Sequence, residues 1–114
     1  MRDEVKDKIT QGPWRLTAHN RNILIYHRRD VDVGLGQIVA IIEASSDEEV
    51  ENAVANAHLI AATPEMYEML KSVWWDFHAL AHDMEDSGDY EFAERMNQKK
   101  DAIYKLLKKA RGEE

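Results

Sequence analysis

The chain has 114 residues, 44% hydrophobic and 32% charged, with a formal net charge of −7 and no cysteine. This length and balance are typical of one globular domain with a small core. The net charge argues against a general nucleic-acid binder, which needs cations to neutralise phosphates. The lack of cysteine excludes a disulfide scaffold and thiolate chemistry.

Neither a targeting signal nor a membrane span is predicted. The opening stretch MRDEVKDKIT lacks the apolar run of a signal peptide, and no later run is long enough to cross a bilayer. We therefore expect a cytoplasmic protein with no membrane contact.

The first third of the chain predicts a β-hairpin. Residues 1–11 are charged without a clear period, as in a short helix or a mobile arm. From Gly12-Pro13-Trp14 onward, Trp14, Leu16 and Ala18 alternate with polar residues, which is the period of a half-buried strand. The turn residues 20–22 tolerate positive φ and lead into a second strand, NILIYHRR.

A third strand is predicted at residues 37–44, QIVAIIEA. Its nearly continuous apolar run indicates that both faces are covered, or that this strand is the central one. The Gly-Leu-Gly in the loop before it, at 30–36, is too short for a dinucleotide fingerprint and is interpreted as a turn.

A helix is predicted over residues 45–63. Ser45 and Ser46 are each followed three residues later by a glutamate, the pattern of a capping box. Asn56 is unusual inside such a helix, so we expect it to make a buried hydrogen bond to the sheet or near Trp14. The apolar residues at helical spacing are mostly small, which suits packing on a sheet: Val50, Ala53, Val54, Ala57, Ile60 and Ala61.

The join Thr63-Pro64-Glu65 predicts a corner between two helices. Pro64 disfavours helical geometry at Thr63, and Thr63 can cap a second helix whose first position suits proline. The join is thus interpreted as architecture. The second helix, over 64–84, carries a heptad seam widened by a neighbouring line: Met66, Leu70, Val73, Phe77, Leu80 and Met84, with Tyr67, Trp74 and Ala81 beside them.

The last helix is predicted over residues 89–110, after a break at Ser87-Gly88-Asp89. Its heptad positions are Phe92, Met96, Ile103, Leu106 and Ala110, with Lys99 as a polar interruption. The predicted fold is α+β: a three-stranded antiparallel sheet with one covering helix, followed by a long antiparallel helical hairpin. We expect a single domain made of an arm (1–11), a sheet (12–44), a helix (45–63) and the hairpin (64–112).

Two stretches resemble a family of small uncharacterised phage and prophage proteins. They are the opening Gly12-Pro13-Trp14 and the later ANAHLIAATPE at 55–65, and KKDAIYKLLKKARGEE is similar to the family's closing helix. The resemblance covers most of residues 12–110. The chain departs from it at Thr63 and in the aromatic stretch VWWDFHALAH. The resemblance implies phage or prophage origin, hence the host cell cytoplasm, and no established reaction.

Candidate ligands for a metal are His78 and His82, four residues apart on one side of a helix. The glutamate that zinc proteases carry beside the first histidine is absent, because Ala79 follows His78. No third ligand is identified, so two partly exposed histidines are the favoured interpretation. No catalytic constellation and no cofactor site are predicted.

Other charged clusters have structural interpretations with functional alternatives. His27 with Arg28-Arg29-Asp30 is able to contact an anion, although charges at a strand end usually face solvent. Basic residues on the last helix suit its dipole or contact nucleic acid: Arg95, Lys99, Lys100, Lys105, Lys108, Lys109 and Arg111.

The leading functional hypothesis is a non-enzymatic phage or prophage accessory protein that binds another protein, including inhibition of a host defence or regulatory system. The alternatives are a metal-dependent enzyme using His78 and His82, or a nucleic-acid-binding module using the last helix. The apolar face of helix 64–84 is too wide for the last helix to cover, which predicts a two-fold homodimer with Trp74 or Trp75 near its centre. The candidate interface residues are Tyr67, Leu70, Trp74, Trp75, Phe77 and His78.

Overall fold

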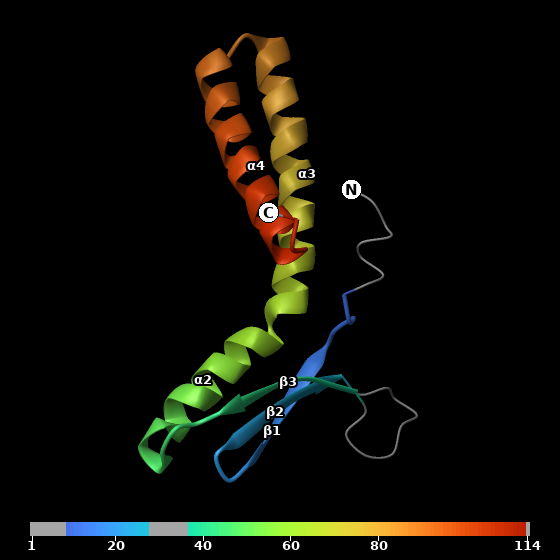
Figure 1. The fold of residues 1–114 in the computed structure, drawn as a ribbon. Coiled ribbons are helices and arrows are strands. Elements are labelled where there is room, and N and C mark those ends of the chain that lie inside the picture. The colour runs from blue at the N-terminus through green and yellow to red at the C-terminus, as the bar shows by residue number, and fades with distance from the viewer. Residues whose placement is uncertain (1–8, 28–36, 114) are drawn as a thin grey trace. The chain divides into compact units, whose positions relative to one another are not determined.

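The computed structural model describes residues 9–27 and 37–113 (Figure 1). The chain divides into two compact units, and the boundary between them in the sequence falls between Glu65 and Met66. Most of the predicted arm, the predicted turn at 30–36 and the anion candidates Arg28, Arg29 and Asp30 lie outside the described residues.

The first unit contains the predicted antiparallel sheet and its covering helix. The strands occur in the order β1-β2-β3, so β2 is central. A short 3-10 helix and an α-helix follow them. The bounds are β1 (Trp14–His19), β2 (Asn22–His27), β3 (Gln37–Glu43), η1 (Asp47–Glu49) and α2 (Val50–Ala61).

The turn between β1 and β2 forms where the turn residues predicted it. His19 pairs with Asn22, and Asn20 between them has a φ of 56°. Asparagine tolerates this left-handed conformation better than most residues do. Arg21 in the same turn donates from Nε to Oδ1 of Asp47 at 2.9 Å, which ties the β-turn to η1.

The predicted place of the third strand is wrong, because β3 lies at the edge of the sheet. Ile38 and Ile41 on its open side are 47% and 57% exposed. A register shift occurs where β2 passes from Ile25 to Tyr26, and the neighbouring residues Val39 and Ala40 both pack against the core. Such a bulge breaks the alternation of a half-buried strand, which makes an edge strand resemble a central one in the sequence.

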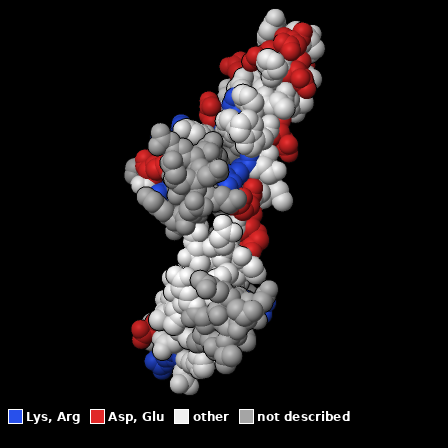
Figure 2. Space-filling model, turned by 90° about the vertical axis from the view of Figure 1, so that its right-hand side faces the viewer, with Lys and Arg blue, Asp and Glu red and all other residues white. Residues whose placement is uncertain are grey.

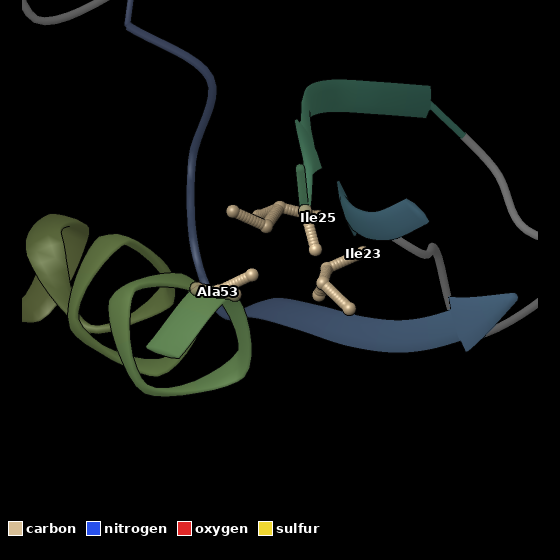
Figure 3. Packing of buried hydrophobic residues seen from close by; sticks show 5 residues of the cluster. Ile23, Ile25 and Ala53 are labelled. Atoms are coloured by element: carbon tan, nitrogen blue, oxygen red, sulfur yellow. The ribbon is translucent and has the colours of Figure 1, made fainter. Parts of the chain in front are cut away.

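The core of the first unit lies between the sheet and α2. Ile23 and Ile25 are fully buried on β2, and Ala53 and Ala57 meet them from α2. Figure 3 shows the two isoleucines and Ala53 gathered between helix and strand. The small side chains predicted for this helix let its backbone approach the sheet closely.

Two predictions about α2 are wrong. The helix begins at Val50 after the η1 turn, and Ser46 makes no side-chain capping bond; only the backbone of Glu49 donates to its carbonyl, at 3.1 Å. Asn56 is exposed. Ala53 and Ala57 define the side that meets the sheet, and helical spacing turns Asn56 away from it.

The predicted break between the two helices is present after α2, but the side chain of Thr63 bonds to the helix before the break. Its hydroxyl donates to the carbonyl of Ile60 at 2.6 Å, so it satisfies a C-terminal group of α2 and does not cap the next helix. The next helix, α3 (Thr63–Ser87), includes Thr63 itself, and Pro64 occupies its first turn as predicted.

The second unit is the predicted antiparallel hairpin of α3 with α4 (Tyr90–Ala110), visible in Figure 1. Gly88 ends α3 with a φ of 88°. Its N–H donates to the carbonyl of Glu85, and the N–H of Asp89 donates to that of Met84, which is the Schellman pattern. Asp89 then caps α4 by accepting from the N–H of Phe92 at 3.2 Å.

The predicted heptad frame of α4 is wrong over its second half. Leu107 is fully buried while Leu106 is exposed, and Lys100 is half-buried while Lys99 is exposed. The side that meets α3 therefore carries Ala93, Met96, Lys100, Ile103 and Leu107.

Within residues 9–27 and 37–113, none of the helices combines the length and apolar character needed to cross a bilayer.

Candidate interaction surfaces of the helical hairpin

The hairpin has two broad faces, and polar contacts between the helices mark one of them. Asn97 donates to Glu85 at 3.3 Å, and Nζ of Lys100 lies 3.1 Å from Nδ1 of His78. Toward the hairpin's open end, away from the turn, the side chain of Arg111 lies near that of Tyr67. On α3 these partners are separated by whole helical turns, so they line one flank. We call this side of the hairpin the polar face.

An aromatic cluster lies on the polar face. The rings of Trp74 and His78 stack with an interplanar angle of 5° and centroids 5.2 Å apart. The ring of Trp75 stands perpendicular to that of Trp74 at 4.8 Å, and Trp75 is 56% exposed. The ammonium of Lys100 lies 5.5 Å from the centre of the Trp74 ring. Lys100 of α4 thus contacts α3 through both its charged ammonium group and the apolar stem of its side chain.

His78 thus has a partner on the other helix. A lysine ammonium only donates, so Nδ1 of His78 is the acceptor in this contact. His82, the other candidate metal ligand, lies instead with Nε2 3.6 Å from Oδ2 of Asp86. The two histidines therefore have different partners. Among the described residues, no group of three or more His, Cys, Asp or Glu is placed to hold a metal ion.

Arg111 fixes the open end of the hairpin. Its side chain is 7% exposed, and its Nε and Nη2 donate to the carboxylate of Glu113 at 2.7 and 3.2 Å. The pKa of Arg111 lies above its ordinary value, mainly because the carboxylate of Glu113 accepts from it; partial burial opposes the shift, and the nearby Tyr67 adds to it. The end of α4 therefore lies beside the first turns of α3 in the hairpin.

The opposite side of the hairpin, which we call the apolar face, leaves large side chains in water. Met66, Met69, Val73 and Leu80 follow one another at helical spacing on the flank of α3 away from His78. Met69 is 64% exposed, and Leu106 on α4 is 53% exposed. Two packed helices have only two broad faces, so these flanks of α3 and α4 lie on the same one.

The predicted interface residues differ in their exposure to solvent. Four of them are half-buried along the hairpin: Tyr67, Leu70, Trp74 and Phe77. Trp75 and His78 are exposed on the polar face. Their role in an interface between molecules stays a prediction. Sequence reasoning missed Met69, which neighbours the predicted heptad position Leu70, and it placed Leu106 in the heptad seam, whereas both side chains are exposed.

Charge is segregated along the hairpin. Residues 76–94, which surround the turn, contain seven acidic residues and no Lys or Arg, whereas residues 95–111 contain seven Lys or Arg and a single Asp. Because α4 returns beside α3, the acidic residues occupy the loop end and most of the basic ones the open end. Figure 2 shows acidic side chains gathered over the loop end.

The remaining polar candidate of the first unit is His27, at the end of β2. His27 is the strand partner of Trp14 across the sheet, and its Nδ1 is buried without a hydrogen-bond partner among the described residues. The arginines that follow it lie outside those residues, so the predicted anion contact stays a prediction.

The two stretches that carry the resemblance meet in the first unit. A Cβ built on Gly12 would lie 2.8 Å from Oε1 of Glu65 and 2.9 Å from Cβ of Pro64. Trp14, from the same stretch, packs against the core and donates from Nε1 to the carbonyl of Thr10 at 3.2 Å. These residues thus hold the beginning of the sheet against the first turn of α3, which is a structural role.

A family model described as Salmonella phage P22 protein Y8K6 matches residues 1–114, so the chain belongs to this phage protein family. No curated protein and no solved structure matches it. The expected phage family is therefore confirmed.

Proposed function

We propose that this phage protein is a non-enzymatic accessory protein that acts by protein–protein binding, and that the apolar face of its hairpin holds a second copy of the chain. The observation that carries the proposal is the exposure of Met66, Met69, Leu80 and Leu106 on one face of the α3–α4 hairpin. Complete burial of a Leu or Met side chain is worth about 1.5–3 kcal/mol. Several such groups offset the cost of association.

A second copy suits this face because the hairpin is complementary to itself. The same molecule offers an apolar surface, an acidic end and a basic end. Closed two-fold pairing of one surface with itself is the commonest form of protein assembly. Membership of a phage family makes a host protein, in a defence or regulatory system, the proposed target of the assembled dimer.

The test is a pair of matched, charge-neutral double variants. Met69→Ser with Leu106→Ser removes exposed apolar groups from the apolar face, and we expect a mass near that of a monomer in light scattering. Tyr90→Ser with Tyr104→Ser removes exposed aromatic groups away from that face, and we expect a dimer. Circular dichroism checks that both remain helical. A wild-type monomer at high concentration, or equal masses for the two variants, would contradict the proposal.

A further inference from the structure

We infer that the two copies pair with their α3 helices antiparallel, so that the acidic loop end of each hairpin lies along the basic open end of the other. The inference rests on the proposed self-association and adds its direction and register. It makes the dimer a four-helix bundle whose central pair is α3 with α3 of the partner subunit.

The direction follows from the segregation of charge. All seven acidic residues of 76–94 are exposed. Residues 95–113 carry seven Lys or Arg against Asp101 and Glu113, so the opposing end has a net positive charge. A parallel pair would place two acidic loop ends together and two basic open ends together. An antiparallel pair places each acidic loop end beside the net basic open end of the other copy. Complementary potentials of this kind select the partner's orientation and speed its association.

The register follows from the apolar residues. An axis between Asp76 and Phe77 sets Val73 opposite Leu80 of the partner subunit, and Met69 opposite its half-buried Met84. The same register sets Met66 beside Ser87 of the partner subunit. Every exposed apolar position of the α3 flank then meets a side chain of the partner, and the pairing is symmetric as a two-fold axis requires.

The absence of native cysteine makes cross-linking a clean test of direction. Met66→Cys and Ser87→Cys are made in separate full-length chains, both at exposed positions. We expect a short bifunctional maleimide to join the two variants when they are mixed, and to join neither variant to itself. Self-joining of the Ser87→Cys chain, with none in the mixture, would show a parallel pair and overturn the inference.

A charge test gives opposite signs for the two directions. The double variant Asp83→Asn with Asp86→Asn removes charge from the loop end. In the antiparallel dimer it deletes attraction, and we expect a dissociation constant about tenfold higher at low salt, with the difference shrinking as salt screens the charges. A tighter dimer would overturn the inference.

The two proposals fail in different ways. A dimer that cross-links in parallel, or that tightens when the loop end is neutralised, sinks the antiparallel inference and leaves self-association intact. A chain that stays monomeric in light scattering, without any cross-linked species, sinks both.

Discussion

Gly12 is the residue at which the two stretches 12–14 and 55–65 contact each other most closely. A methyl group there would meet Pro64, whose ring is rigid, as well as the more mobile carboxylate of Glu65. We expect Gly12→Ala to destabilise the first unit by about 1–3 kcal/mol, the usual range for overpacking. Urea unfolding followed by Trp14 fluorescence, in a chain carrying Trp74→Phe and Trp75→Phe, measures this. An unchanged midpoint would mean that the contact relaxes freely.

Arg111 is the residue on which the open end of the hairpin depends. Removing its guanidinium leaves the carboxylate of Glu113 without the two hydrogen bonds that Arg111 donates to it. We expect Arg111→Met to lower hairpin stability by about 1.5–3 kcal/mol, as for hydrogen bonds to charged groups. The matched control is Lys109→Met at an exposed position of the same turn, expected to stay within about 0.5 kcal/mol. Equal losses in the two variants would argue against a special role for Arg111.

At the scale of elements, the α3–α4 link depends on the left-handed conformation of Gly88. Its φ of 88° is one that side chains disfavour, although a Cβ there would meet nothing within 4 Å. We expect Gly88→Ala to cost about 1–2 kcal/mol from backbone strain alone. Gly88→Asn should cost less, because asparagine tolerates this conformation better. Thermal unfolding by circular dichroism ranks the three chains, and an alanine variant as stable as the wild type would refute the argument.

The sequence predicted correctly those elements that depend on a few neighbouring residues. The turn at Asn20, the break at Gly88 and the small-residue face of α2 each depend on one backbone conformation or one periodicity, and each was predicted. The frame of α4 was not. Lys99 and Lys100 are neighbours, as are Leu106 and Leu107, so two heptad frames fit almost equally. The frame is decided by Trp74 and His78 on α3, which give Lys100 a ring and an acceptor.

The edge position of β3 was hidden for a related reason. An apolar run reports that side chains avoid water, but it does not say which element covers them. The bulge that turns Val39 and Ala40 toward the core removes the alternation that would have marked a half-buried strand. The apolar face of the hairpin was similarly visible as an excess of large side chains. Which side of the hairpin carries this apolar face could be assigned only once the contacts of α3 with α4 were known.

At the scale of the whole molecule, the structural and interaction roles separate between the two units. The contact of Gly12 with Pro64 belongs to the first unit, where it fixes packing. The exposed apolar groups and the segregated charges belong to the hairpin. If the hairpin self-associates, its stability should therefore rise with protein concentration. The stability of the first unit should depend less on concentration, because the proposed dimer contact does not involve it.

The three tryptophans allow this difference to be measured. Trp14 reports the first unit, and Trp74 and Trp75 report the hairpin. We expect the hairpin transition of a Trp14→Phe chain to move to higher temperature as concentration rises, because each tenfold increase adds about 1.4 kcal/mol of stability per dimer. A chain with Trp74→Phe and Trp75→Phe should show a first-unit transition that shifts less. Adding Met69→Ser and Leu106→Ser should abolish the concentration dependence of the hairpin signal. A hairpin transition that ignores concentration in the wild-type background would contradict the dimer, because a folded form stabilised by a second copy must follow mass action.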